Sequence, residues 1–295
     1  MRVVTVTLAL LLLWPGAGSA REARRVLRHT EVVVFRYRAH DGVERRAWLL
    51  LPADYEPGHP IPLVISPHGR GTSARQNVRL WGDLPGIGGF AVVNPAGEGR
   101  RLEEYSWGDP GQIEDLARMP ALVERHGVDV ERGRIYAFGG SMGGQETLLL
   151  LARHPHLLAG AAAFDPDTNM ARRYWDFASL PEGQTLQRLA REEIGGTPLT
   201  APARYAERSP DTYARQIALS GVPLQLYWST RDRVITDQRA ETGALADEIL
   251  GWNPYAPLVV FRGSWRHTAE MRWCSRLPQA LVRFRLITRS QAIQI

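Results

Sequence analysis

The sequence predicts an α/β fold in which a mostly parallel sheet is covered by helices on both faces. Short apolar runs alternate with helical patterns along most of the chain. Strands that alternate with helices pair in parallel and need a helical layer on each side. In addition, a glycine-flanked serine in Gly139 to Gly144 lies between an apolar run and a Leu-rich stretch. This pattern is typical of a buried strand that turns sharply into a helix.

The length and composition favour one domain with a sizeable core. The chain has 295 residues, of which 44% are hydrophobic, and α/β folds of this size are commonly single domains. We therefore expect one domain over residues 21–295.

The first twenty residues have the pattern of a secretory signal peptide. An apolar run from Val3 to Trp14 follows Arg2, and the small residues Gly18 and Ala20 precede Arg21. The run is short for a membrane span, and small residues suit a signal-peptidase site. We expect cleavage after Ala20, no stable membrane insertion of the mature protein, and an extracellular or periplasmic location. The alternative is an uncleaved anchor helix.

Charge, cysteine content and motifs exclude several kinds of partner, cross-link and cofactor. The formal net charge is +5, and the basic residues are spread along the chain. No basic stripe with interleaved aromatic residues is present, so we expect no nucleic acid partner. The single cysteine, Cys274, excludes an internal disulfide. No cofactor is expected, and no metal is expected because HExxH and paired Cys or His patterns are absent.

The first half of the predicted sheet begins with a hairpin. Residues 31–39 and 43–52 have strand patterns and are joined by Asp41-Gly42, a strong turn signal. Two apolar runs, 62–66 and 90–93, then predict buried parallel strands, with a short helix over 73–81 between them. Asp109, Pro110 and Gln112 are typical of a helix start, with Asp109 as the cap.

The second half continues the alternation. Strands are predicted at 135–138, 159–164, 222–228 and 258–261, with helices at 145–153 and 236–250 and a closing helix after residue 267. Residues 168–218 show weaker periodicity and several prolines and glycines. We interpret this segment as a cap inserted between two strands.

Ser141 is the candidate nucleophile. The predicted strand–turn–helix order forces its backbone into a strained conformation, and the flanking glycines let strand and helix approach closely. The result is a nucleophile elbow, which presents the serine Oγ at the carboxyl edge of the sheet.

A serine needs a base and an orienting acid, and the chain offers both in the order Ser, Asp, His. His267 follows the last strand, whereas His154 and His156 lie too near Ser141 in sequence to fold back over it. Asp232 follows the strand at 222–228 and is the preferred acid. Asp165, which follows the strand at 159–164, is the alternative.

Acyl transfer also needs backbone N–H groups that stabilise the oxyanion. Met142, directly after Ser141, supplies one candidate donor. The segment His68-Gly69-Arg70-Gly71 resembles the His-Gly pair of many hydrolases. This resemblance makes Arg70 the preferred second donor and Gly71 the next choice.

Two tryptophans are candidate pocket residues. Trp107 precedes the capped helix, and Trp265 lies two residues before His267. Aromatic side chains near these loops suit an apolar or aromatic acyl group. The alternative is that they belong to the core.

Together, His68-Gly69, Gly139 to Gly144, Asp232 with Val234, and His267 make the chain similar to α/β-hydrolases of the prolyl oligopeptidase (S9) and esterase-like branch. The resemblance spans about residues 31–284 and implies a serine hydrolase. Family oligopeptidases carry a propeller domain ahead of the catalytic domain, and few residues precede the first strand here. We therefore expect ester hydrolysis on a small-molecule or polymer-derived substrate. A prolyl oligopeptidase-type peptidase and, more remotely, a non-catalytic binding module are the alternatives.

Overall fold

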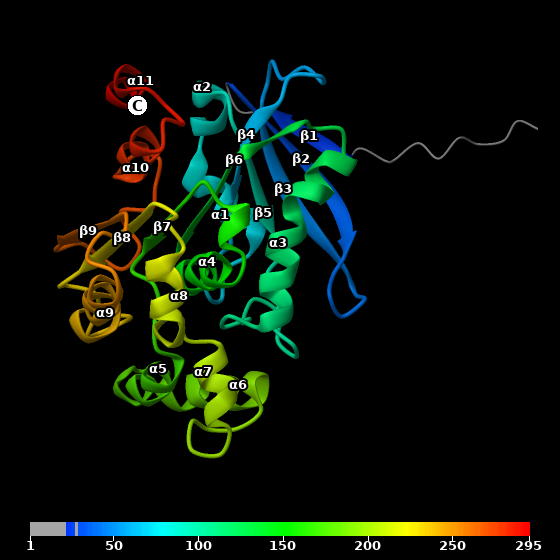
Figure 1. Ribbon diagram of the computed structural model, residues 1–295. Helices are drawn as coiled ribbons and strands as arrows, with labels where there is room; N and C mark the ends of the chain where they lie inside the picture. Colours follow the sequence, from blue (N-terminus) through cyan, green and yellow to red (C-terminus); the bar gives the residue numbers. More distant parts are fainter. Residues whose placement is uncertain (1–21, 27–28) are drawn as a thin grey trace, which may run out of the picture.

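A nine-stranded sheet forms the centre of the protein, as the computed structural model shows for residues 22–26 and 29–295 (Figure 1). The strand order is β1-β2-β3-β5-β4-β6-β7-β8-β9. Three antiparallel pairings join β1 (Glu22–Val26), β2 (Thr30–Arg38), β3 (Glu44–Pro52) and β5 (Ala91–Pro95). From β5 onward each strand pairs in parallel with its neighbour in the sheet. These strands are β4 (Ile61–Ile65), β6 (Val130–Gly140), β7 (Gly160–Phe164), β8 (Leu224–Ser229) and β9 (Leu258–Gly263). The predicted α/β-hydrolase type of sheet is confirmed.

The hairpin of β2 and β3 turns at the predicted residues. The N–H of Ala39 donates to the Val43 carbonyl at 2.8 Å, and Gly42 has a φ of 83°. Glycine adopts this left-handed conformation without a steric penalty. The Asp41-Gly42 signal therefore fixes the register of the two long strands.

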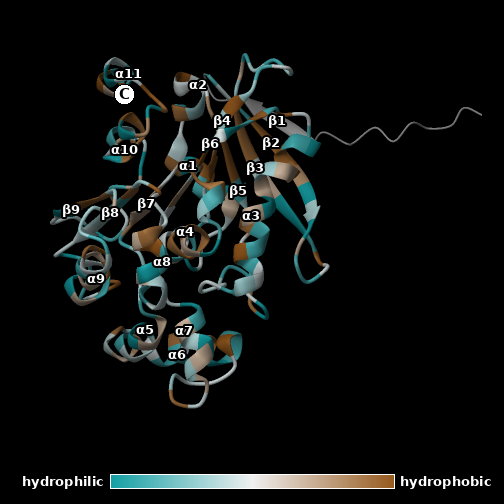
Figure 2. Cartoon of the chain, in the orientation of Figure 1, coloured by the Kyte–Doolittle hydropathy of each residue, from teal (hydrophilic) through white to brown (hydrophobic). Residues whose placement is uncertain are grey.

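Helices cover both faces of the sheet, and β4 shows how the strands divide between them. Leu63 and Ile65 pack in the cluster that holds α3 (Pro110–Arg125), α4 (Met142–Arg153), α8 (Ala214–Leu219) and α9 (Ala244–Trp252). Val64 points to the other cluster, with α1 (Ala74–Trp81), α2 (Leu84–Gly88), α10 (Leu277–Arg283) and the neighbouring α11 (Arg289–Gln294). Successive side chains of a strand alternate between faces, so an entirely apolar strand is buried on both. Figure 2 shows these central strands as the most hydrophobic part of the ribbon.

Between β7 and β8 the chain forms a cap. It contains α5 (Met170–Asp176), α6 (Gly183–Ile194) and α7 (Pro202–Glu207), with the 3₁₀ turns η2 (Phe177–Ser179) and η3 (Pro210–Tyr213). Figure 1 shows α5, α6 and α7 as a group set apart from the sheet. The structure shortens the cap expected over residues 168–218, because α8 packs against α4 and α9 in the helical layer.

Some predicted elements differ in detail. The helix expected at 236–250 starts as a π-helical turn, η4 (Arg239–Gly243), and continues as α9. The closing helix begins only at Leu277, after an irregular segment that follows His267. The expected signal peptide, residues 1–20, lies outside the described residues. None of the helices within 22–26 and 29–295 combines the length and apolarity that a membrane crossing requires.

Candidate active site

Ser141 lies at the sharp turn between β6 and α4. Its φ of 56° and ψ of −129° are strained for a residue with a side chain. The turn is held because the Ser141 N–H donates to the Phe164 carbonyl at 2.9 Å. A Cβ at Gly139 would lie 2.1 Å from the Gly143 carbonyl oxygen, and one at Gly143 would lie 2.3 Å from that of Pro67. Side chains at these two positions would force the turn open.

Asp232 and His267 form a direct pair. The Nδ1 atom of His267 lies 2.6 Å from Oδ2 of Asp232. The other Asp232 oxygen accepts backbone N–H groups from Val234 at 2.8 Å and Ile235 at 3.0 Å. Burial by itself would raise the pKa of Asp232, but the hydrogen bond and charge of His267 and these N–H donors hold it below its usual value.

The ionised Asp232 fixes the tautomer of the imidazole. A carboxylate can only accept, so His267 carries its proton on Nδ1 when the ring is neutral. The Nε2 atom is then an acceptor, and it is buried with no hydrogen-bond partner among the described residues. An unpaired basic nitrogen of this kind suits a general base.

The serine and histidine loops meet at the carboxyl edge of the sheet. A Cβ at Gly140, the neighbour of Ser141, would lie 3.1 Å from the side chain of Thr268, the neighbour of His267. Ser141 follows β6, Asp232 follows β8 and His267 follows β9. Because parallel strands end at the same edge, three distant parts of the sequence gather there.

Asp165 fixes the loop that carries His267. Its Oδ2 accepts the Trp265 Nε1–H at 2.9 Å and the Thr268 backbone N–H at 2.8 Å. No pattern in the sequence pointed to these contacts. Burial raises the pKa of Asp165 to about 6, although the charge of His267 partly opposes this. Asp165 therefore holds residues on both sides of His267, while the hydrogen bond to Nδ1 belongs to Asp232.

The backbone around Arg70 is held by His68. The Gly69 carbonyl accepts from His68 Nδ1 at 2.9 Å and from the Thr72 hydroxyl at 2.7 Å, and His68 Nε2 accepts the Gly97 N–H at 2.9 Å. Burial lowers the pKa of His68, which agrees with a neutral ring that donates on one side and accepts on the other. The Gly69–Arg70 peptide is planar, so fixing its carbonyl also fixes the Arg70 N–H.

The two predicted oxyanion donors are both placed next to Ser141. A Cβ at Gly69 would lie 3.8 Å from the Ser141 Cβ, which brings the Gly69–Arg70 peptide close to the serine. Met142 is the first residue of α4, where backbone N–H groups have no partner within the helix. The alternative donor, Gly71, already donates its N–H to the Glu104 carbonyl at 3.1 Å.

The sequence also matches a known family. The model of the prolyl oligopeptidase family matches residues 89–245, which is more than half of the chain. The chain belongs to the prolyl oligopeptidase family. No match is found among curated protein sequences. Family and fold together support a hydrolase.

Solved structures share the fold of this prolyl oligopeptidase family member. A putative dipeptidyl aminopeptidase IV from Bacteroides ovatus matches with a TM-score of 0.69 and 17% identity, over 88% of this chain and 36% of that one. The acylaminoacyl peptidase of Pyrococcus horikoshii matches with a TM-score of 0.64 and 20% identity, over 87% of this chain and 42% of that one. The S-formylglutathione hydrolase of Agrobacterium tumefaciens matches with a TM-score of 0.65 and 13% identity, over 90% of this chain and 98% of that one. The chain thus spans about two fifths or less of these two peptidases.

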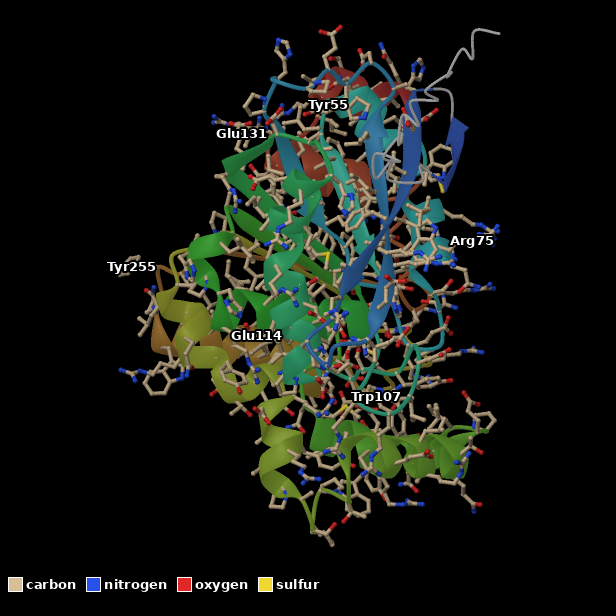
Figure 3. The ribbon with its side chains drawn as sticks, turned by 90° about the vertical axis from the view of Figure 1, so that its right-hand side faces the viewer. Tyr55, Arg75, Trp107, Glu114, Glu131 and Tyr255 are labelled. Atoms are coloured by element: carbon tan, nitrogen blue, oxygen red, sulfur yellow. The ribbon has the colours of Figure 1, made fainter. Side chains whose placement is uncertain are left out.

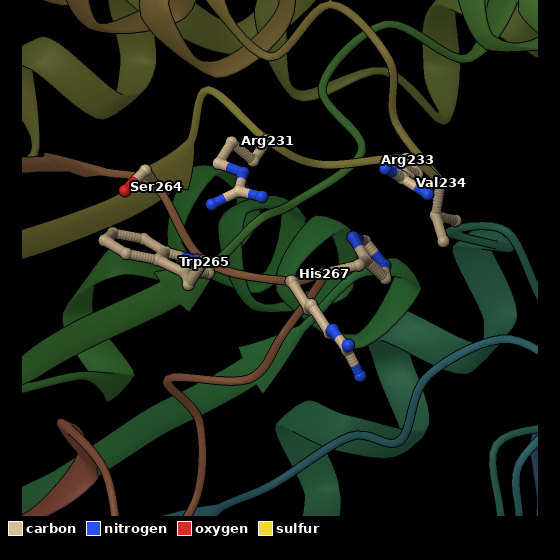
Figure 4. A pocket seen from close by; sticks show the side chains of 7 residues that line it. Arg231, Arg233, Val234, Ser264, Trp265 and His267 are labelled. Carbon is tan, nitrogen blue, oxygen red and sulfur yellow. The ribbon is translucent and has the colours of Figure 1, made fainter.

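A cavity of about 560 Å³ lies beside His267 in this family member (Figure 4). Figure 4 shows Trp265 and His267 on one side, with Arg231 and Arg233 on the loop opposite. The cavity is lined by Arg231, Arg233, Val234, Ser264, Trp265, Arg266 and His267. The structure thus places Trp265 at a cavity wall and also ties its indole to Asp165.

Trp107 does not line this cavity. It is fully buried where the cap meets the rest of the molecule (Figure 3). Its ring lies 6.0 Å from that of Phe177, and its backbone N–H donates to the Met142 sulfur at 3.3 Å. Trp107 is therefore a core residue that contacts Met142 and does not line the cavity.

Asp165, Asp232 and His267 could together offer ligands to a metal, because their donor atoms lie within 4.8 Å of one another. Nevertheless, Asp232 Oδ2 and His267 Nδ1 are bonded to each other, and Asp165 Oδ2 accepts two N–H groups. A metal would have to break these hydrogen bonds. The present arrangement suits proton transfer through the imidazole instead.

Proposed function

We propose that the protein is a secreted serine hydrolase that cleaves carboxylic esters through an acyl-enzyme on Ser141. The observation that carries the proposal is the arrangement at the sheet edge. A strained serine lies beside the loop of an imidazole whose Nδ1 is held by Asp232 and whose Nε2 is free. This is the arrangement that activates a serine hydroxyl.

Each residue has a defined step in this reaction. His267 Nε2 takes the proton from Ser141 as Oγ attacks the ester carbon, and the carbonyl oxygen becomes an oxyanion. The N–H groups of Met142 and Arg70 stabilise it, by about 3 kcal/mol per donor in the transition state. His267 then gives its proton to the alkoxide oxygen as the C–O bond breaks. A water molecule repeats the sequence and releases the acid.

Ester hydrolysis is favoured over peptide cleavage because it makes fewer demands on the site. Chemically, amides have poorer leaving groups, so a peptidase must also bind an extended peptide and protonate the departing nitrogen. Family membership keeps peptide cleavage as the second candidate.

Matched substrates separate the two activities. We expect kcat/KM for activated or phenolic esters to exceed that for the matching anilides by at least about a hundredfold, equivalent to roughly 2.7 kcal/mol of transition-state stabilisation. The comparison uses short-chain and long-chain p-nitrophenyl esters, and a Z-Gly-Pro anilide with its ester counterpart in the same buffer. Comparable efficiency on the last pair would make the peptidase the better interpretation.

Secretion is part of the proposal and rests on the apolar run that precedes Arg21. We expect the exported protein to begin at Arg21. Mass spectrometry of the intact secreted protein measures this directly. Retention of residues 1–20 in the exported protein would count against a cleaved signal.

A further inference from the structure

A second cluster of charges lies beside the elbow, outside the residues that the proposed reaction uses. Arg173 of α5 is only 2% exposed. Its Nε lies 3.3 Å from Asp167 Oδ2, but without hydrogen-bond geometry. Within the described chain, Nε and Nη1 of Arg173 and Oδ1 of Asp167 are buried without a hydrogen-bond partner. Leaving such groups unpaired is costly in a folded protein.

Arg70 brings a second guanidinium to the same place. Its Cζ lies 5.9 Å from the centre of the Phe177 ring, and that of Arg173 lies 4.6 Å from the same centre. In the part of the chain that the structure describes, the Arg70 side chain has no hydrogen bond and no carboxylate within salt-bridge distance. Burial, and next the positive charge of Arg173, lower the pKa of Arg70. Asp167 makes a salt bridge with Arg173 only, whereas Arg70 senses the charges of Asp167 and Glu182 from a greater distance.

The cluster lies on the oxyanion and cap side of Ser141. Arg70 follows Gly69, and a Cβ placed on that glycine would be 3.8 Å from the Ser141 Cβ. Phe177 packs 6.0 Å from Trp107, which in turn contacts Met142. The cavity beside His267 does not include these residues. Because His267 serves the leaving group in the proposed reaction and Arg70 lies on the oxyanion side of Ser141, we assign a ligand at Arg70 to the acyl part of the substrate.

We propose that Arg70 and Arg173 form an anion subsite that binds a carboxylate on the acyl group, so that the preferred substrates are monoesters of dicarboxylic acids. This inference rests on the proposed ester hydrolysis and names its substrate class. A guanidinium presents parallel N–H donors that match a carboxylate, and such pairs are strongest where water is excluded. A bound carboxylate supplies a salt-bridge partner for Arg70 and an acceptor for the unpaired donors of Arg173.

The test compares two esters of equal chain length. Mono-p-nitrophenyl adipate carries a free carboxylate, and the p-nitrophenyl methyl diester of adipic acid carries a neutral ester in its place. We expect kcat/KM to be at least about 30-fold higher for the acid, as hydrogen bonds to charged groups predict. Arg70→Gln and Arg173→Gln should each reduce this preference to below about fivefold.

Arg75→Gln is the matched control. Arg75 is exposed on α1, away from the cluster, and its substitution removes the same charge (Figure 3). It should leave the preference unchanged. Circular dichroism reports whether each variant folds; should Arg173→Gln fail to fold, the preference of Arg70→Gln decides the question.

Three results would overturn the subsite. They are equal efficiency of the native protein on both esters, retention of the preference in Arg70→Gln, and its loss only in a triple variant of Arg231, Arg233 and Arg266 to Gln. If neither ester is hydrolysed, the proposed function fails but the subsite remains testable by calorimetry with adipate. Binding that Arg70→Gln weakens at least tenfold supports the subsite, and absence of binding to the native protein refutes it.

Discussion

At the scale of single residues, Ser141 and His267 are expected to act as one unit. Each of Ser141→Ala and His267→Ala should lower kcat by about 10⁴- to 10⁶-fold, and the double variant should be scarcely worse, because the serine and its base act only together. The measurement is steady-state hydrolysis of a p-nitrophenyl ester by folded, purified variants. Substantial turnover by a clean Ser141→Ala preparation would contradict these roles.

The two carboxylates of the site should differ sharply. Asp232→Asn loses the acceptor that fixes the His267 tautomer, and we expect kcat to fall by about 10⁴-fold. Asp165→Asn keeps an oxygen that can still accept from Trp265 and Thr268, so its kcat should fall far less. Parallel kinetics of the two variants test this. The reverse order would move the acid to Asp165.

Residue types and chain order were enough to predict the three candidate catalytic residues. The order Ser, Asp, His and the positions after strands identify Ser141, Asp232 and His267, because the ends of parallel strands meet. The contacts of Asp165 with the His267 loop could not be predicted. They depend on how two loops pack across the sheet edge, which leaves no local pattern in the sequence.

At the scale of elements, α4 carries a buried acid that couples stability to pH. Glu146 accepts a hydrogen bond from Ser106, and burial raises its pKa from 4.5 to about 8. Between these values the folded protein binds more protons than the unfolded chain. The contribution of Glu146 to the free energy of unfolding is therefore most favourable near pH 4.5. It falls by up to about 5 kcal/mol as the pH rises to 8.

Glu146→Gln removes this dependence while it keeps a neutral polar side chain. The variant should lose less stability than the native protein between pH 5 and pH 9, and should be the more stable of the two at pH 9. Urea unfolding at pH 5, 7 and 9 measures the difference. Other buried acids, such as Glu241, titrate in both proteins and cancel in the comparison. Parallel pH profiles would refute the assignment to Glu146.

The cap is held to the catalytic body by charges that sequence patterns do not reveal. Glu193 of α6 accepts backbone N–H groups from Arg100 at 2.6 Å, Arg101 at 2.7 Å and Leu102 at 3.1 Å. Arg208, after α7, donates to Asp109 at 2.6 Å. These bonds connect the cap with the loop that carries Trp107, so the cap is docked on the catalytic body.

Buried strands were predictable and marginal elements were not. β4 to β8 carry apolar runs because both sheet faces are covered there, and this is a strong local signal. The edge strand β9 was also predicted from its apolar run, although it is half-buried to exposed. β1 has the sequence EARRV and joins the edge of the sheet by pairing with β2. Such an edge strand needs backbone hydrogen bonds but no apolar pattern, so the sequence did not predict it.

At the scale of the whole molecule, the fold explains why the sequence predicts the position of the candidate site but does not predict its substrate. The parallel strands bring the candidate residues to one edge regardless of the surface loops. The proposed substrate preference depends instead on how the cap places Phe177 and Arg173 beside Arg70. This is a tertiary arrangement between segments that show no mutual pattern in the sequence.

Covalent labelling determines whether Ser141 is a nucleophile that His267 activates. A fluorophosphonate probe should label the native protein once, and peptide mass spectrometry should place the adduct on Ser141. Ser141→Ala should not be labelled, and His267→Ala should react at least about a hundredfold more slowly because its serine lacks a base. Folded native protein that remains unlabelled, or an adduct on another residue, would contradict the account.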